Sequence, residues 1–146
     1  MQWYELDPER LEIEIRLMER EGVNFQLCRD ENYNLLWRGP IRVRGHLHRD
    51  VRLVYPETFP YEPIELYILE PKLPPFEHVA INGRVCYCRR EEWNPDWTAL
   101  AVYLTAIRFL DEYYSGKMFK RRKQLSAPNF GDQESLFRRI LEVLRG

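Results

Sequence analysis

The sequence predicts a single α+β domain, in which an antiparallel sheet lies between an N-terminal helix and a later, more apolar helix. Three observations support this class. An amphipathic helical pattern comes first, four short β-prone runs with short connections follow it, and a long apolar helical pattern comes after them. With 146 residues, the chain is long enough to bury one core without disulfides or a metal. We therefore expect one domain over residues 1–146, without an internal repeat.

The first helix is predicted by its capping residues and by its apolar spacing. Asp7 is a typical N-cap, Pro8 suits the first helical position, and Gly22 marks the end. Between them, apolar side chains recur at helical spacing at Leu11, Ile15 and Met18. The helix should therefore turn one apolar stripe toward the core.

Four β-prone runs follow, separated by turn residues or by charge. They cover residues 23–28, 35–47, 51–55 and 64–69, and the second run continues past Gly39-Pro40. Short connections between consecutive strands predict a four-stranded antiparallel meander. His46 and His48 alternate along this predicted sheet, so we expect both to be exposed sheet residues.

Two helices are predicted after the strands. Over residues 97–114, one apolar face carries Leu100, Leu104, Ile107 and Tyr114, flanked by Ala101 and Leu110. A basic connector at 117–123 leads to a last helix, a C-terminal extension at about 130–145 capped near Asp132. The apolar residues of that last helix are Leu136, Phe137, Ile140, Leu141 and Leu144. The connector is either a solvated linker or a contact for a partner protein.

Composition excludes several classes of function. A formal net charge of −1 argues against a bulk electrostatic binder of nucleic acid. Apolar runs fall short of membrane-spanning length, and the chain starts without a basic segment followed by an apolar one. The three cysteines lack the paired spacing of a zinc site or a disulfide framework, which favours a reducing, cytoplasmic setting. No metal or organic cofactor is implied. The chain also lacks a phosphate-binding glycine-lysine loop, so we expect any ATP chemistry to belong to another protein.

The most informative segment runs from Asn82-Gly83 to Cys86. Asn-Gly accepts the positive φ that most residues refuse, so the chain can reverse there and present Cys86 at a fixed angle. A thiolate is a strong nucleophile and a good leaving group, which suits a carrier of acyl groups as thioesters. Taken alone, the pattern also fits an inert cysteine buried in a strand.

Three ordered motifs resemble those of the ubiquitin-conjugating enzymes, and the resemblance covers roughly residues 5–115. They are Phe59-Pro60-Tyr61-Glu62-Pro63, Asn82-Gly83-Arg84-Val85-Cys86 and Trp93-Asn94-Pro95-Asp96-Trp97-Thr98. The resemblance implies the UBC fold, with an active-site loop between the meander and the central helix, and a cis Phe59-Pro60 bond. It also implies that Cys86 accepts the C-terminus of a ubiquitin-like modifier from an activating enzyme and passes it to a target protein. Asn82, Gly83, Pro60, Trp93 and Cys88 would then support the site.

Two positions depart from the family pattern. The signature His-Pro-Asn triplet is replaced by Phe76-Glu77-His78, and Cys88 stands where the family has an acidic residue. These departures resemble divergent bacterial members of the family, which occur with ubiquitin-like proteins and are linked to antiphage defence. His78 could donate a hydrogen bond to the oxyanion or accept a proton from the attacking amine. It could also be a loop histidine that bonds its own backbone.

The nucleophile is predicted to be Cys86, because it occupies the cysteine position of the motif. Cys88 should face the same side of an extended segment. The two Cα atoms would lie about 6.5–7 Å apart, near the upper limit for a disulfide, so a resting disulfide is not expected. The aromatic and proline residues around the cysteine either build a platform for it or simply pack the core.

Two other readings of the chain stay open. A noncatalytic UBC-fold module could bind a ubiquitin-like protein or a partner enzyme, and the altered triplet favours that reading. A cysteine hydrolase could use Cys86 and His78, but the sequence offers no third residue to orient the histidine. The sequence also leaves open whether the acceptor atom is a lysine nitrogen or a hydroxyl oxygen.

Overall fold

The computed structural model describes residues 1–22 and 24–116. Its helices are α1 (Trp3–Leu6), α2 (Pro8–Glu21) and α3 (Ala99–Ser115), with a 3-10 turn, η1, at Arg90–Glu92. The strands are β1 (Gln26–Arg29), β2 (Leu35–Ile41), β3 (Arg49–Val54), β4 (Glu65–Glu70) and β5 (Arg84–Val85). The basic connector and the last helix that the sequence predicts lie outside the described residues. None of the helices within the described ranges has the length and apolarity needed to cross a membrane.

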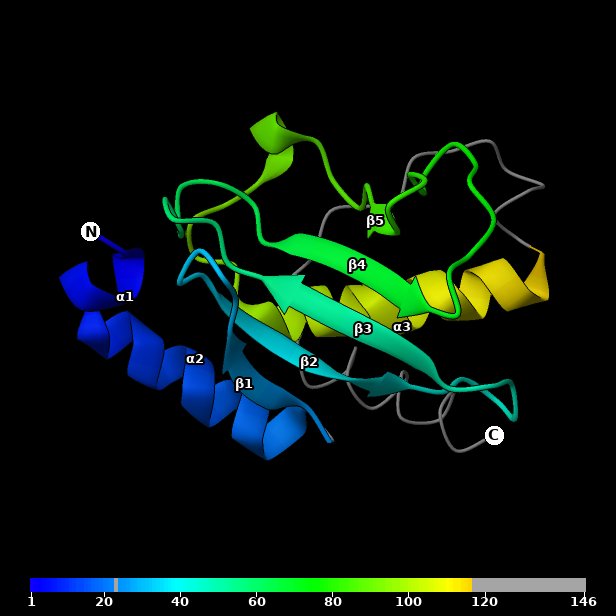
Figure 1. The fold of residues 1–146 in the computed structure, drawn as a ribbon, viewed down its shortest axis with the longest axis horizontal. Helices are drawn as coiled ribbons and strands as arrows, with labels where there is room; N and C mark the ends of the chain where they lie inside the picture. Colours follow the sequence, from blue (N-terminus) through cyan, green and yellow to red (C-terminus); the bar gives the residue numbers. More distant parts are fainter. Residues whose placement is uncertain (23, 117–146) are drawn as a thin grey trace.

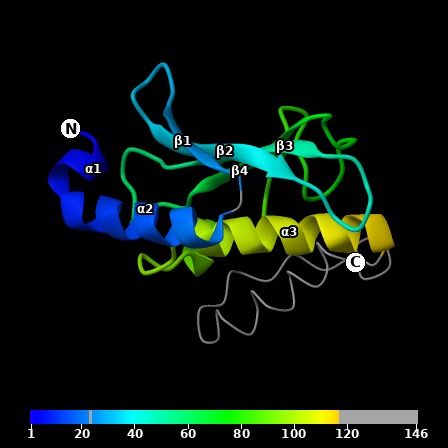
Figure 2. The same ribbon diagram turned by 90° about the horizontal axis from the view of Figure 1, so that it is seen from below.

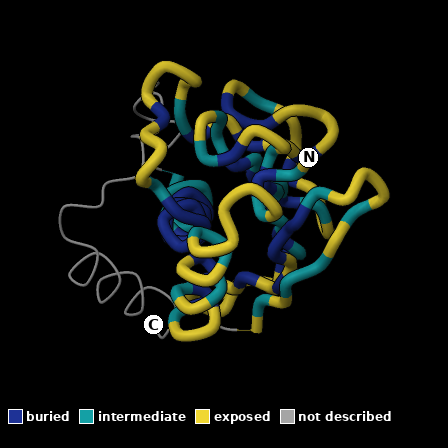
Figure 3. Tube along the Cα trace, turned by 90° about the vertical axis from the view of Figure 1, so that its left-hand side faces the viewer, coloured by how far each residue is buried: buried dark blue, intermediate teal, exposed yellow. Residues whose placement is uncertain are grey.

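The α+β class is confirmed. All five strands are antiparallel to their neighbours and follow chain order, β1-β2-β3-β4-β5 (Figure 1). Helices α2 and α3 lie on the same side of the sheet, as Figure 2 shows. Buried stretches of chain gather in the interior while exposed stretches follow the loops (Figure 3). The opposite face of the sheet is left without a covering helix among the described elements.

Helix α2 begins and ends where the sequence predicts. The Asp7 carboxylate accepts the Arg10 backbone N–H at 3.1 Å, and the Gly22 N–H closes the last turn on Met18 O at 2.7 Å. Helix α1 was not expected from the sequence. It places Trp3 against Tyr55 and Phe59, with ring centroids 4.9 and 4.7 Å apart.

The sheet differs from the predicted meander in two places. The predicted strand over 35–47 is wrong beyond Ile41, because Arg44 (φ 41°) and Gly45 (φ 76°) turn the chain out of the sheet. His46 then stacks on Tyr114 of α3, with ring centroids 3.8 Å apart, so residues 42–48 cross toward the helix. His46 and His48 are exposed as predicted, but in a loop rather than in a strand.

The second difference is at the two ends of the sheet. β1 begins at Gln26 rather than at residue 23, since Asn24 has a left-handed φ of 62° that extended backbone excludes. A fifth strand, β5, pairs with β4 through Leu66–Val85 and Tyr67–Arg84. The predicted number of four strands is therefore wrong, because the sheet has this short fifth strand at its edge. The fifth strand joins the cysteine segment to the sheet.

Helix α3 forms the centre of the core. Thr98 caps its start by accepting the Ala101 N–H, and Gly116 ends it in the left-handed conformation (φ 75°). The predicted face is confirmed: Leu100, Leu104 and Ile107 are buried together with the flanking Ala101 and Leu110, while Tyr114 is half-buried. Nearly every residue from Ala99 to Leu110 is buried, so this helix is covered on more than one face.

Candidate functional site

The turn before the cysteine segment is built as the sequence predicts. Gly83 has a φ of 88°, its N–H donates to Ala80 O at 3.0 Å, and the Asn82 side chain accepts the Arg84 N–H at 3.1 Å. A Cβ on Gly83 would lie 2.6 Å from Ile68 O of β4. Only glycine therefore allows both the positive φ and this close approach to the neighbouring strand.

Cys86 follows β5 directly and is exposed. Burial alternates along this segment, with Gly83, Val85 and Tyr87 buried and Cys86 turned outward. The Cys86 backbone N–H donates to His78 O at 2.9 Å. The thiol is thus presented to solvent from a backbone that is fixed on both sides.

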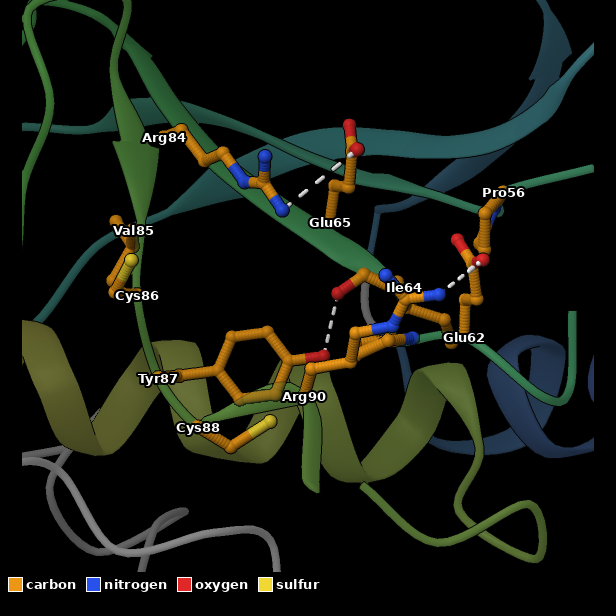
Figure 4. A pocket seen from close by; sticks show the side chains of 11 residues that line it. Pro56, Glu62, Ile64, Glu65, Arg84, Val85, Cys86, Tyr87, Cys88 and Arg90 are labelled. Atoms are coloured by element: carbon orange, nitrogen blue, oxygen red, sulfur yellow. Dashed lines mark hydrogen bonds and ion pairs between the residues drawn. The ribbon is translucent and has the colours of Figure 1, made fainter. Parts of the chain in front are cut away.

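Tyr87 anchors the segment between the two cysteines. Its ring is buried, and its hydroxyl donates to Ile64 O next to the start of β4 (Figure 4). Burial raises the pKa of Tyr87 well above its ordinary value of 10, so the hydroxyl stays protonated and remains a donor. The sequence analysis missed this residue, although its place between two outward positions of an extended segment is the signal that marks it as buried.

Cys88 is half-buried, in contrast to Cys86. Burial, and then the charges of Glu92 and Cys86, raise the pKa of the Cys88 thiol to about 12. At neutral pH Cys88 is therefore almost entirely the unreactive thiol, since the thiolate is the nucleophile. This difference supports Cys86 as the reactive cysteine of the pair.

Two surface depressions flank the cysteine segment, and Cys86 and Cys88 border both of them. The first, which we call the proline side, is drawn in Figure 4 and lies toward β4. Its other lining residues are Pro56, Glu62, Pro63, Ile64, Glu65, Arg84, Val85, Tyr87 and Arg90. The second, which we call the histidine side, is completed by Glu77, His78, Tyr87, Arg89 and Arg90.

Most charges around these depressions are offset by ion pairs. On the proline side, Arg84 lies 3.8 Å from Glu65 and Arg90 lies 2.7 Å from Glu62. Arg89, on the histidine side, lies 3.6 Å from Glu92. These pairs are largely exposed, so they orient side chains more than they stabilise the fold.

His78 lies beside Cys86, as the motif comparison predicts. Its residue is only 5 % exposed, and its ring meets Phe76 edge-on at 6.2 Å. It borders the same depression as the thiol, and its carbonyl holds the Cys86 N–H. The histidine therefore contacts the cysteine segment through its backbone, a contact that the sequence analysis did not foresee.

Several of the predicted platform residues contact one another. The Phe59-Pro60 peptide bond is cis, as predicted. Pro60 O accepts the Trp93 indole N–H at 2.8 Å, and Trp93 meets Trp97 edge-on at 5.5 Å. Phe59 and Trp93 are buried, so both residues pack the core.

A polar cluster below the platform was also missed by the sequence analysis. Glu14 of α2 is 1 % exposed, and its carboxylate accepts the Tyr55 hydroxyl at 2.9 Å and the Ala99 N–H at 2.8 Å. Arg10 lies 3.5 Å from the same carboxylate and donates to Trp97 O at 2.8 Å. A glutamate within an amphipathic helix gives no sequence signal of burial, because most such residues face water.

Within residues 1–22 and 24–116, no group of three or more His, Cys, Asp or Glu side chains is arranged to hold a metal ion. The site instead offers one exposed thiol, a buried histidine at its side and two shallow surfaces next to it. This arrangement can perform nucleophilic acyl chemistry on a partner that brings its own activated carbonyl. The chain matches no protein-family model and no curated protein.

Proposed function

We propose that the chain is a conjugating enzyme of the ubiquitin-conjugating type, which carries a ubiquitin-like modifier as a thioester on Cys86. The observation that supports this most is the exposed Cys86 thiol on a segment fixed by the Gly83 turn, the His78 carbonyl and the Tyr87 hydroxyl. A carrier needs a thiol that two different proteins can reach in turn. A thiol enclosed in a deep cleft would exclude both of them.

In the loading step, the Cys86 thiolate attacks the activated carbonyl carbon at the modifier's C-terminus. A new C–S bond forms, the bond to the leaving group on the activating enzyme breaks, and the leaving group takes up the proton that Cys86 has lost. In the transfer step, a nucleophile of the target protein attacks the thioester carbonyl and Cys86 departs as the thiolate. ATP is consumed by the activating enzyme, so this chain requires no nucleotide site.

The order of the elements supports the proposal at the level of the fold. A helix, an antiparallel sheet with the cis Phe59-Pro60 bond between β3 and β4, the cysteine segment and a central helix follow one another along the chain. The raised pKa of Cys88 supports it at the level of chemistry, because it leaves Cys86 as the reactive thiol of the pair. We place the pathway in the reducing cytoplasm, in a system of the bacterial antiphage type.

Thioester formation tests the proposal directly. The genes next to that of this chain are searched for an activating enzyme and a ubiquitin-like protein. The chain is then incubated with ATP and these two proteins, and the products are separated on a gel without reductant. We expect an adduct that reductant releases, that is absent in Cys86→Ala and that persists in Cys28→Ala. Binding of the modifier without an adduct would support the noncatalytic module instead, and cleavage of a preformed conjugate would support the hydrolase.

A further inference from the structure

Glu77 differs from the other charged residues around Cys86. It is exposed and borders the histidine side, where the family triplet would place a proline. Arg89 and Arg90 border the same depression, but Arg89 is paired with Glu92 and Arg90 with Glu62. Among the described residues, Glu77 has no ion-pair partner. Its charge is therefore the one on this surface that is not offset by a neighbour.

The proline side has the opposite character. Glu62 and Glu65 are paired with Arg90 and Arg84, and Pro63, Ile64 and Val85 supply apolar surface between them. This surface is electrically balanced and suits an extended peptide without charge. The two depressions that Cys86 borders thus differ in charge.

We propose that Glu77 is a specificity-determining residue that recruits a protonated primary amine, the lysine side chain of the acceptor, to the histidine side of Cys86. This inference rests on the proposed carrier function. The tail of the modifier occupies the proline side, and the acceptor enters from the side of Glu77. The carboxylate raises the local concentration of the cationic amine near the thioester, whereas a hydroxyl acceptor gains nothing from it.

Transfer to the acceptor begins with the loss of a proton from its amine. The ammonium ion of the acceptor first releases one proton to solvent, which leaves a neutral amine with a free electron pair. The nitrogen attacks the thioester carbonyl, the C–N bond forms, and the C–S bond breaks. The nitrogen gives up a second proton, which ends on the departing Cys86 sulfur. Glu77 binds the cation before the first of these events and forms no covalent bond.

The test uses the full chain preloaded with its modifier, with Glu77→Gln as the variant. Discharge is followed in single turnover with two nucleophiles: Nα-acetyl-lysine methyl ester, whose side chain is cationic, and hydroxylamine, which is neutral. We expect Glu77→Gln to slow discharge to the lysine probe by about two- to fivefold, the size of one exposed charge pair. Discharge to hydroxylamine and the rate of loading should be unchanged.

Glu91→Gln is the matched control, because Glu91 is an exposed carboxylate of η1 that borders neither depression. It should leave both discharge rates unchanged, and added salt should shrink the effect of Glu77→Gln. Equal slowing with both probes, or unchanged discharge to lysine, would overturn the role of Glu77. Failure of the wild-type chain to load any modifier would overturn the carrier function instead, so the two failures are distinct.

Discussion

Cys86 and Cys88 differ in chemistry although one residue separates them. Cys86 is exposed, whereas Cys88 is half-buried and its thiol has a pKa of about 12. A thiol with that pKa is ionised only to about one part in ten thousand at pH 8, because each unit of pKa is a tenfold change. Tyr87, which lies between them, donates its hydroxyl hydrogen to Ile64 O and fixes the segment.

Replacement of each cysteine should therefore have unequal effects. We expect Cys86→Ala to abolish the reductant-sensitive adduct, and Cys88→Ala to keep most of it. Cys86→Ser should give an adduct that resists reductant, since an oxyester has the poorer leaving group. Gel assays of loading with the three variants measure this, and equal loss of adduct in both alanine variants would contradict the assignment of the nucleophile.

His78 can be tested separately from its backbone contact. His78→Ala keeps the carbonyl that binds the Cys86 N–H but removes the imidazole ring of a residue that borders the same depression as Cys86. If the ring stabilises the oxyanion, the variant should slow discharge about a hundredfold to a thousandfold, with a smaller effect on loading.

His78→Asn is the matched control for this prediction, because it restores a side-chain donor and the family's residue. It should recover part of the lost discharge rate. Discharge of His78→Ala at the wild-type rate, with the fold intact, would show that the histidine serves only through packing and its carbonyl.

Two short elements, the 80–84 turn and β5, set the position of the cysteine. The turn places Gly83 directly against β4, where Gly83 O accepts the Ile68 N–H at 2.9 Å. β5 has only two residues, so most of its placement depends on this turn and on the buried Val85. Errors in the turn should therefore affect both the fold and the site.

Gly83→Ala and Gly45→Ala form a matched pair for this element. Both glycines have a positive φ. A residue with a Cβ loses about 1–2 kcal/mol of stability in that backbone conformation. Only at Gly83 does the Cβ also meet backbone, at 2.6 Å from Ile68 O, while at Gly45 no atom lies within 4 Å. Gly83→Ala should lower the free energy of unfolding by at least about 1 kcal/mol more than Gly45→Ala, as overpacking typically does.

Urea unfolding measures this difference, and the thioester assay should show slower loading in Gly83→Ala alone. Equal loss of stability in the two variants would mean that β4 yields freely to the added methyl group. The close approach of the turn would then have no part in positioning Cys86.

At the scale of the whole molecule, Glu14 joins the helices to the sheet. Its carboxylate accepts from Tyr55 of the sheet region and from Ala99 at the start of α3, and Trp37 donates to Tyr55 in turn at 2.9 Å. Burial raises the pKa of Glu14 above its ordinary value of 4.5, although the Ala99 N–H, Arg10 and Tyr55 each oppose the shift. The folded protein therefore holds this proton more tightly than the unfolded chain does.

The pH dependence of stability follows from that direction. Stability that Glu14 contributes is fully present below pH 4.5, the pKa in the unfolded chain, and is lost as the pH rises through the higher pKa of the folded state. Glu14→Gln keeps an oxygen that can accept from Tyr55 and Ala99, but it does not titrate. We expect the stability of the wild type relative to Glu14→Gln to fall between pH 4 and pH 7, measured by urea unfolding at each pH. A difference that stays constant or grows with pH would contradict the raised pKa.

The sequence by itself determined the features that depend on local backbone and side-chain chemistry. Asp7, Pro8 and Gly22 predict α2 because caps act within one turn of a helix, and Asn82-Gly83 predicts the turn because glycine accepts the positive φ that Gly83 has there. The apolar spacing of α3 and the Phe59-Pro60 run are signals of the same kind. The grouping of Cys86, Pro60 and Trp93 in one site is instead what the family resemblance implies, and it stays a prediction.

Only the tertiary structure decided what depends on contacts between distant segments. Residues 42–48 leave the sheet where His46 meets α3, and two residues at 84–85 become a strand because β4 offers its edge. In the packed structure, Cys88 is half-buried whereas Cys86 is exposed, Glu14 lies in the core, and Glu77 is exposed. These features could not be predicted from the sequence pattern. Desolvation of a side chain and pairing of a strand depend on which distant segments come into contact, and those contacts are set by the packing of the whole molecule.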